Sequence, residues 1–169
     1  MSYRRFGAMI ATSTVVMFGL MYLNTYAVEH VRFSQTRMGM ALLMGAVMAV
    51  VMLGFMWRMY DGRRLKIGIL AGAALVASGC LWLVRSQQTV GDVAYMKAMI
   101  PHHSIAVMTS ERAHIRDPQV RRLADQIIAA QVREIAEMKR HIARLEAEPP
   151  PPGARDLASY RDRGAPPPA

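Results

Sequence analysis

The sequence has one cysteine, few aromatic residues and few acidic ones. Of its 169 residues, 7% are aromatic, 20% are charged and 53% are hydrophobic. A single cysteine excludes an intrachain disulfide framework, and the high apolar content excludes disorder over most of the chain. Twelve acidic residues face 21 Lys and Arg, for a net charge of +9. The basic residues lie between apolar runs, as in membrane proteins, so we expect no nucleic-acid partner.

Charge is absent from three long segments, residues 6–28, 38–57 and 67–84. About 20 helical residues cross a hydrocarbon core of about 30 Å. The segments therefore predict three transmembrane helices in a membrane domain of residues 1–85. The first segment is longer than the apolar part of a signal peptide and lacks a clean small-residue cleavage site, so we expect it to be retained.

The distribution of basic residues predicts the orientation of these helices. The first loop carries two basic residues, and Arg85 follows the third segment. The N-terminus and the second loop together carry six: Arg4, Arg5, Arg58, Arg63, Arg64 and Lys66. The richer side is cytoplasmic by the positive-inside rule. We therefore expect a multi-pass protein of the bacterial plasma (inner) membrane, in contact with lipid, with its C-terminal domain extracytoplasmic.

Residues 86–148 have the pattern of two amphipathic helices. Thr89 and Asp92 resemble a capping box, and Pro101 is expected to kink or interrupt the first helix. Asp117 followed by Pro118 predicts the start of the second helix. Its expected core face comprises Val120, Leu123, Ile127, Gln131, Glu134, Met138, Ile142 and Leu145. The fold class is therefore all-α, with three transmembrane helices, an antiparallel two-helix hairpin and a Pro-rich tail, residues 149–169, that we expect to be disordered.

A single hairpin buries little core, so we expect help from a partner. Two copies packed together would form a four-helix bundle. Because the chain contains no internal repeat that supplies a second hairpin, we expect a homo-oligomer.

Histidine and methionine residues gather on the facing sides of this hairpin. A turn near residues 116–117 would place position 103 opposite 130–131, position 99 opposite 134 and position 96 opposite 137–138. Thioether and imidazole groups together suit copper, since methionine favours Cu(I) and histidine accepts either oxidation state. The expected metal ligands are Met96, Met99, His103 and Met138, with His102 as a second choice and Gln131 or Glu134 orienting His103. In the alternative, the methionines fill the core and a polar neighbour satisfies the histidine.

The same residues carry a resemblance to a known family. They are Met96, Met99, Ile100, Pro101, His102, His103, Ala106, Leu123, Ala124, Ile127, Ile128, Gln131, Glu134, Ile135 and Met138. Over about residues 92–145 the chain resembles the bacterial domain of unknown function 305 (DUF305) family. The resemblance implies a ferritin-like fold, of which one hairpin is half, and copper binding as in secreted members linked to copper tolerance. Those members usually carry two hairpins or additional Met and His.

Other chemistries find little support in the sequence. Glu111 and His114 have the spacing of a ferritin-like di-iron site, but no carboxylate is expected opposite them, so we reject a di-iron centre. With no Ser-His-Asp or Cys-His arrangement and no phosphate-binding loop, we expect no catalytic or cofactor-binding residue, no small-molecule substrate and no enzyme. A row of methionines in the second segment forms either a packing ridge, which we favour, or a thioether ladder for Cu(I): Met40, Met44, Met48, Met52 and Met56. Cys80 is expected to be a small buried apolar residue.

The expected function is a membrane-anchored copper-binding protein that buffers copper, or confers tolerance to it, on the outer face of the plasma membrane. The alternative is a structural or signalling membrane protein whose hairpin mediates dimerisation without metal.

Overall fold

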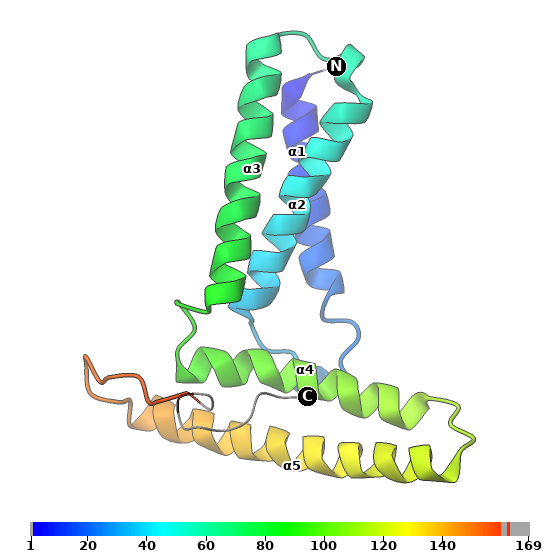
Figure 1. Ribbon diagram of the computed structural model, residues 1–169, viewed down its shortest axis with the longest axis vertical. Coiled ribbons are helices and arrows are strands. Elements are labelled where there is room, and N and C mark those ends of the chain that lie inside the picture. Colours follow the sequence, from blue (N-terminus) through cyan, green and yellow to red (C-terminus); the bar gives the residue numbers. More distant parts are fainter. Residues whose placement is uncertain (1, 160–161, 163–169) are drawn as a thin grey trace.

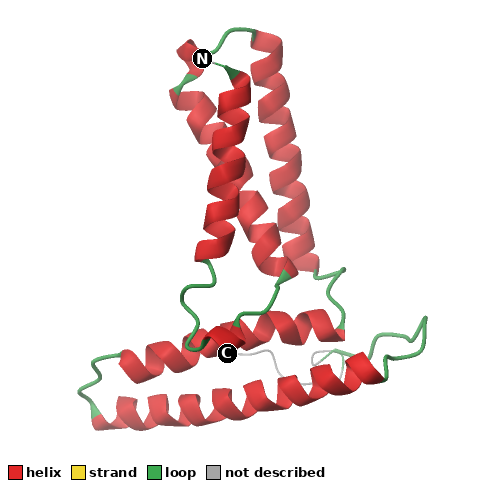
Figure 2. Cartoon of the chain, turned by 180° about the vertical axis from the view of Figure 1, so that it is seen from behind, coloured by secondary structure: helices red, strands yellow, loops and turns green. Residues whose placement is uncertain are grey.

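The structure, a computed structural model, describes residues 2–159 and 162. In these residues the chain forms five α-helices and two short 3-10 helices, with no β-strand, which confirms the all-α prediction for this part of the chain. The elements are α1 (Tyr3–Leu20), η1 (Val28–His30), α2 (Gln35–Phe55), η2 (Trp57–Met59), α3 (Arg63–Ser86), α4 (Asp92–Arg112) and α5 (Pro118–Ala147). Helices α1 to α3 stand side by side as a bundle, and α4 and α5 lie across one end of it (Figure 1). Figure 2 shows the same crosswise arrangement from behind.

Two of the three expected membrane helices are long and apolar enough to cross a bilayer, namely α2 and α3. The first expected segment, residues 6–28, is helical only as far as Leu20. Its uncharged part, Phe6–Leu20, has 15 residues, or about 22 Å of helix. A tertiary contact ends α1 early, because the Arg37 guanidinium donates to the Met21 carbonyl and lies 4.6 Å over the Tyr22 ring. This contact satisfies the carbonyl end of α1 in place of another helical turn.

The bundle is held by an aromatic cluster at one end and by close helix contact in the middle. Phe6, Leu53 and Tyr60 are buried together where α1 begins and α2 ends. Farther along, a Cβ at Gly45 of α2 would collide with the Thr14 hydroxyl of α1, so this glycine allows the two helices to approach. The five methionines of the α2 row are all half-buried, and Met52 and Met56 pack against the aromatic cluster. For Met52 and Met56 these contacts are those expected of a packing ridge.

Helices α4 and α5 lie antiparallel, joined by residues 113–117, and are called the hairpin below (Figure 1). The predicted start of α5 is confirmed, because the Asp117 carboxylate accepts hydrogen bonds from the amides of Gln119 and Val120 at 2.8 and 2.9 Å. The predicted capping box of α4 is wrong. Helix α4 begins after Gly91 without a side-chain cap. The Thr89 hydroxyl instead donates a hydrogen bond to the side-chain oxygen of Gln35 in α2, at 3.2 Å.

Of the two outcomes predicted for Pro101, a kink or an interruption, the interruption is wrong, because α4 runs through this residue to Arg112. Pro101 is fully buried, in the same turn as the fully buried Ile100. Packing on the hairpin core therefore outweighs the local cost of a proline inside a helix, which is about 3 kcal/mol.

The predicted core face of α5 is confirmed near the end of the helix, at Met138, Ile142 and Leu145, and is wrong near its start. The buried residues are Ala124, Ile135 and Ile142, whereas Val120 and Leu123 are 50% and 56% exposed. Helix α5 carries two adjacent apolar stripes, and the single helix α4 covers only one of them. The hairpin core joins Met96 and Ile100 of α4 to Ile135 and Ile142 of α5, with Val93, Met138 and Leu145 at its margin.

We predict that Gly45→Ala lowers the free energy of unfolding of the bundle by about 1–3 kcal/mol, because the added methyl group pushes α1 away from α2. Gly54→Ala on the same helix is the matched control, since a Cβ there meets nothing within 4 Å. Unfolding of the full chain in mixed micelles by a denaturing detergent measures both. Equal stability of the two variants would contradict the proposed close contact.

Candidate metal centre

His103 of α4 lies at the seam between the two helices of the hairpin and faces Glu134 of α5. Its Nδ1 atom is 3.0 Å from the Glu134 Oε2 atom, and its side chain is 15% exposed. The two atoms are within ion-pair distance, so the Glu134 carboxylate is the polar partner of the buried Nδ1. A carboxylate in this position orients the ring and leaves Nε2 as the nitrogen that a metal ion could bind.

Burial lowers the pKa of His103, and the neighbouring His102 acts in the same direction, whereas the Glu134 carboxylate opposes them. His103 is therefore mostly neutral at neutral pH. Neutral imidazole is the form that binds metals. The burial of His103 thus favours the neutral imidazole that a metal ligand requires.

Glu134 is one of the two residues expected to orient His103, although the expected register placed residues 130–131 opposite position 103. Helical side chains lean toward the N-terminus of their own helix. His103 leans back toward the level of Met99, and this is the level at which Glu134 was expected. Glu134 is therefore the acidic neighbour of His103, while Gln131 is half-buried one turn away.

The structure brings only some of the predicted ligands together. Met96 is 8% exposed within the apolar core, and Met138 packs against the same cluster. Met99 is half-buried, and His102 is exposed, with its ring centre 5.9 Å from that of His103. In the described part of the chain no three His, Cys, Asp or Glu side chains are grouped to hold a metal. A metal ion at His103 would therefore depend on methionine thioethers.

The α1–α2 loop, of which only the part up to residue 28 was predicted to lie in a membrane span, contacts the hairpin through residues that were not predicted as contacts. The Ser104 hydroxyl of α4 accepts a hydrogen bond from the Tyr26 amide at 2.7 Å and lies 2.9 Å from His30 Nδ1. Glu29 pairs with Lys139 of α5 at 2.9 Å. Because residues 6–28 carry no charge, the start of this loop could not be distinguished from a membrane span in the sequence. Glu29 and His30, directly after residue 28, could have indicated a polar contact.

Glu111 is exposed, as expected of a surface charge, and it also contacts the α1–α2 loop. Its carboxylate accepts a hydrogen bond from the Tyr26 hydroxyl, which raises the pKa of Tyr26. Glu111 is therefore a second point at which the loop contacts α4.

Ser104, His30 and Glu29 form a chain of polar contacts that superficially resembles a hydrolase triad. His30 Nε2 lies 3.4 Å from Glu29 Oε1. Ser104, however, has no exposed surface, and its oxygen already accepts the Tyr26 amide hydrogen bond. No substrate can reach this hydroxyl, so the chain of contacts is structural.

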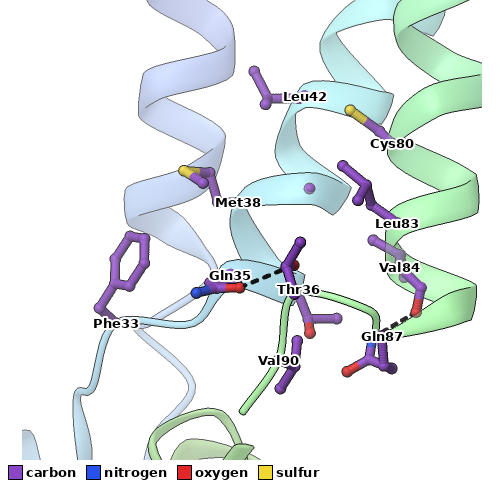
Figure 3. A pocket seen from close by; sticks show the side chains of 12 residues that line it. Phe33, Gln35, Thr36, Met38, Leu42, Cys80, Leu83, Val84, Gln87 and Val90 are labelled. Atoms are coloured by element: carbon purple, nitrogen blue, oxygen red, sulfur yellow. Dashed lines mark hydrogen bonds between the residues drawn. The ribbon is translucent and has the colours of Figure 1, made fainter. Parts of the chain in front are cut away.

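The single cysteine lines an apolar pocket of about 240 Å³ between α2 and α3. Figure 3 shows the Cys80 thiol pointing from α3 toward α2, with Gln35 and Gln87 at the end of the pocket nearer the hairpin. Cys80 is 8% exposed, in agreement with its predicted role as a small buried apolar residue. One thiol in an apolar wall makes no metal centre by itself.

Comparisons with known proteins concern the hairpin. Residues 91–165 match the family model described as "Domain of unknown function (DUF305)", which supports the resemblance for this part of the chain. The match includes α4 and α5 with all the predicted ligands. An uncharacterized protein of Acanthamoeba polyphaga mimivirus is 38% identical over 60 residues, which are 34% of this chain and 40% of that protein. The chain thus spans less than half of that curated relative, and no solved structure matches.

We predict that Glu134→Gln lowers the pKa of His103 further, because the Glu134 charge stabilises the imidazolium form. An NMR titration of the histidine ring signals measures this. Glu137→Gln, which removes a carboxylate 3.6 Å from His141 Nε2, is the control and should leave the His103 titration unchanged. An unchanged or raised pKa of His103 in Glu134→Gln would show that the pair is not formed.

Proposed function

We propose that the chain is a membrane-anchored copper-binding protein that carries copper on its hairpin, as a buffer or in copper tolerance, and is not an enzyme. The observation that supports this most is the position of His103, whose largely buried imidazole lies at the seam of the hairpin with Nδ1 3.0 Å from Glu134 Oε2, on the helix that also carries Met96 and Met99. The DUF305 match over the same residues adds to the support. Copper is the cargo here, and no reaction is assigned.

The proposed ligand set combines His103 with the thioethers of Met96, Met99 and Met138. His102 is a second-choice ligand, since it is exposed and adjacent to His103. Glu134 and Gln131 orient the His103 ring. Soft thioether ligands favour Cu(I) over Cu(II), and rotation of the flexible methionine side chains brings their sulfur atoms toward the imidazole.

We further propose that α1, α2 and α3 all cross the bilayer, with the hairpin on the outer side. The chain start and the α2–α3 connection lie at one end of the bundle, and the hairpin lies at the other (Figure 1). The basic residues that predict the cytoplasmic side are therefore at the end away from the hairpin. Trp57 near that end and Trp82 near the hairpin are 39% and 60% exposed, as expected of aromatic residues at the two membrane interfaces.

The alternative function, dimerisation without metal, is favoured by a different observation. Val120, Leu123 and Ile127 form an apolar row on α5 that α4 leaves 36–56% exposed. A second hairpin packed on this row would complete a ferritin-like four-helix bundle. Self-association is compatible with copper binding, so only the absence of copper binding would make it the main function.

For the copper site, we predict that His103→Ala weakens copper binding by more than about tenfold, because it removes the nitrogen ligand. Met99→Leu should weaken Cu(I) binding selectively, since leucine keeps the volume and removes the sulfur. Competition with a chromophoric chelator, using the full chain in detergent under reducing and oxidising conditions, measures both affinities.

His114→Ala is the matched control for these variants, because His114 is exposed and about three helical turns from His103. Its copper affinity should equal that of the parent chain. Parent-like binding by both His103→Ala and Met99→Leu would place the site elsewhere. A parent chain that sediments as a dimer and binds no copper would support the alternative function.

For the orientation, we predict that a cysteine introduced by Ser159→Cys is labelled by a membrane-impermeant reagent in intact cells. A Cys80→Ala background removes the native thiol. Asp61→Cys, between α2 and α3, is the matched control and should be labelled only after the membrane is permeabilised. Labelling of Asp61→Cys but not Ser159→Cys in intact cells would reverse the orientation.

A further inference from the structure

The α1–α2 loop connects the two helices of the hairpin to each other and to the bundle, and its residues 26–30 are called the strap below. Within residues 26–30 the loop contacts α4 twice, at Ser104 and Glu111, and α5 once, at Lys139. This loop also leads directly into α2, so a displacement of the hairpin would also displace the start of α2. The strap therefore joins three parts of the chain that are distant in sequence.

The contact at Ser104 is the most specific part of this strap. Ser104 is fully buried, and two donor or acceptor groups of the loop, the Tyr26 amide and His30 Nδ1, converge on its oxygen. The His30 side chain is only 12% exposed. Because a buried polar group without a partner is costly, the loss of this contact would leave the Tyr26 amide and the His30 ring nitrogen unsatisfied.

The strap attaches to residues adjacent to the proposed copper ligands. Ser104 follows His103 on α4, and Lys139 follows Met138 on α5. Fixing the backbone at Ser104 and at Lys139 therefore limits the rotation and separation of the two helices at the level of the seam. The direction of the His103 ring depends on the same helical turn that the loop holds.

We propose that Ser104 and His30 are positioning residues for the copper site, so that binding of copper at His103 and docking of the α1–α2 loop stabilise each other. This inference rests on the proposed function and adds to it a route by which the bundle responds to copper. The coupling is reciprocal, since any factor by which the docked loop strengthens copper binding is the factor by which copper strengthens docking. A change in the bundle that releases the loop thus releases copper.

The test compares four variants of the full chain in detergent with the parent chain. Ser104→Ala removes both hydrogen bonds between Ser104 and the loop, and His30→Leu removes the one between His30 and Ser104. His30→Asn keeps an acceptor near the position of Nδ1 and therefore preserves it. Thr109→Ala is the matched control on α4, because the Thr109 hydroxyl bonds only to carbonyls of its own helix, at Ile105 and Ala106.

Two measurements are made on each chain, the Cu(I) affinity by chelator competition and the hydrogen exchange of residues 26–31 with and without Cu(I). We expect Ser104→Ala and His30→Leu to bind Cu(I) about threefold to tenfold more weakly, the worth of one hydrogen bond. His30→Asn and Thr109→Ala should remain close to the parent. Cu(I) should slow exchange of the loop in the parent and in His30→Asn, but not in Ser104→Ala.

The possible failures are distinguishable. A parent chain that binds Cu(I) at His103, together with unchanged affinities in Ser104→Ala and His30→Leu and no effect of Cu(I) on loop exchange, would overturn the coupling and leave the proposed function intact. A parent chain that binds no Cu(I) would overturn both. Weak binding by His30→Asn as well as His30→Leu would also count against the coupling, because the acceptor is restored in the first variant.

Discussion

The structure depends on one turn of α4, from Ile100 to Ser104, which is packed on two sides. Ile100 enters the core shared with α5, and Ser104 receives the α1–α2 loop. Ile100, Pro101 and Ser104 have almost no exposed surface. The Ile100 contact holds the two helices of the hairpin together, and the Ser104 contact, at 2.7 Å, holds the hairpin to the loop that leads into the bundle. The same turn carries His103, so this packing determines where the candidate metal centre lies.

Local signals in the sequence predicted the elements that depend on a few neighbouring residues. Asp117 and Pro118 start α5 as expected, and the long uncharged runs correspond to α2 and α3. Tertiary contacts decided the rest. Arg37 binds the Met21 carbonyl at the end of α1, so the helix ends early. The Thr89 hydroxyl is hydrogen-bonded to Gln35 rather than capping α4. Helix α4 covers the apolar stripe of α5 that contains Ile135. None of these partners is near in sequence, so periodicity alone could not identify them.

The candidate centre was predictable in its residue types and less so in its geometry. The spacing of Met96, Met99 and His103 placed them on one face of α4, but the direction of each side chain decides which groups meet. His103 leans to Glu134, while Met96 enters an aliphatic cluster. The contacts of His30 and Ser104 lay outside the prediction, because a loop that follows an apolar run has no period that indicates its partner.

The short α1 has a consequence for any bilayer around the bundle. Its uncharged part of about 22 Å is about 8 Å shorter than an average hydrocarbon core, whereas α2 and α3 are long enough to cross one. In the proposed topology with three spans, such a hydrophobic mismatch would be relieved by local thinning of the lipid on the side of the short helix, at a fraction of a kcal/mol per Å. The surface beside α1 would therefore form a shallow depression. A thin bilayer would accommodate this chain with less distortion than a thick one, and lipid composition would influence where the protein resides.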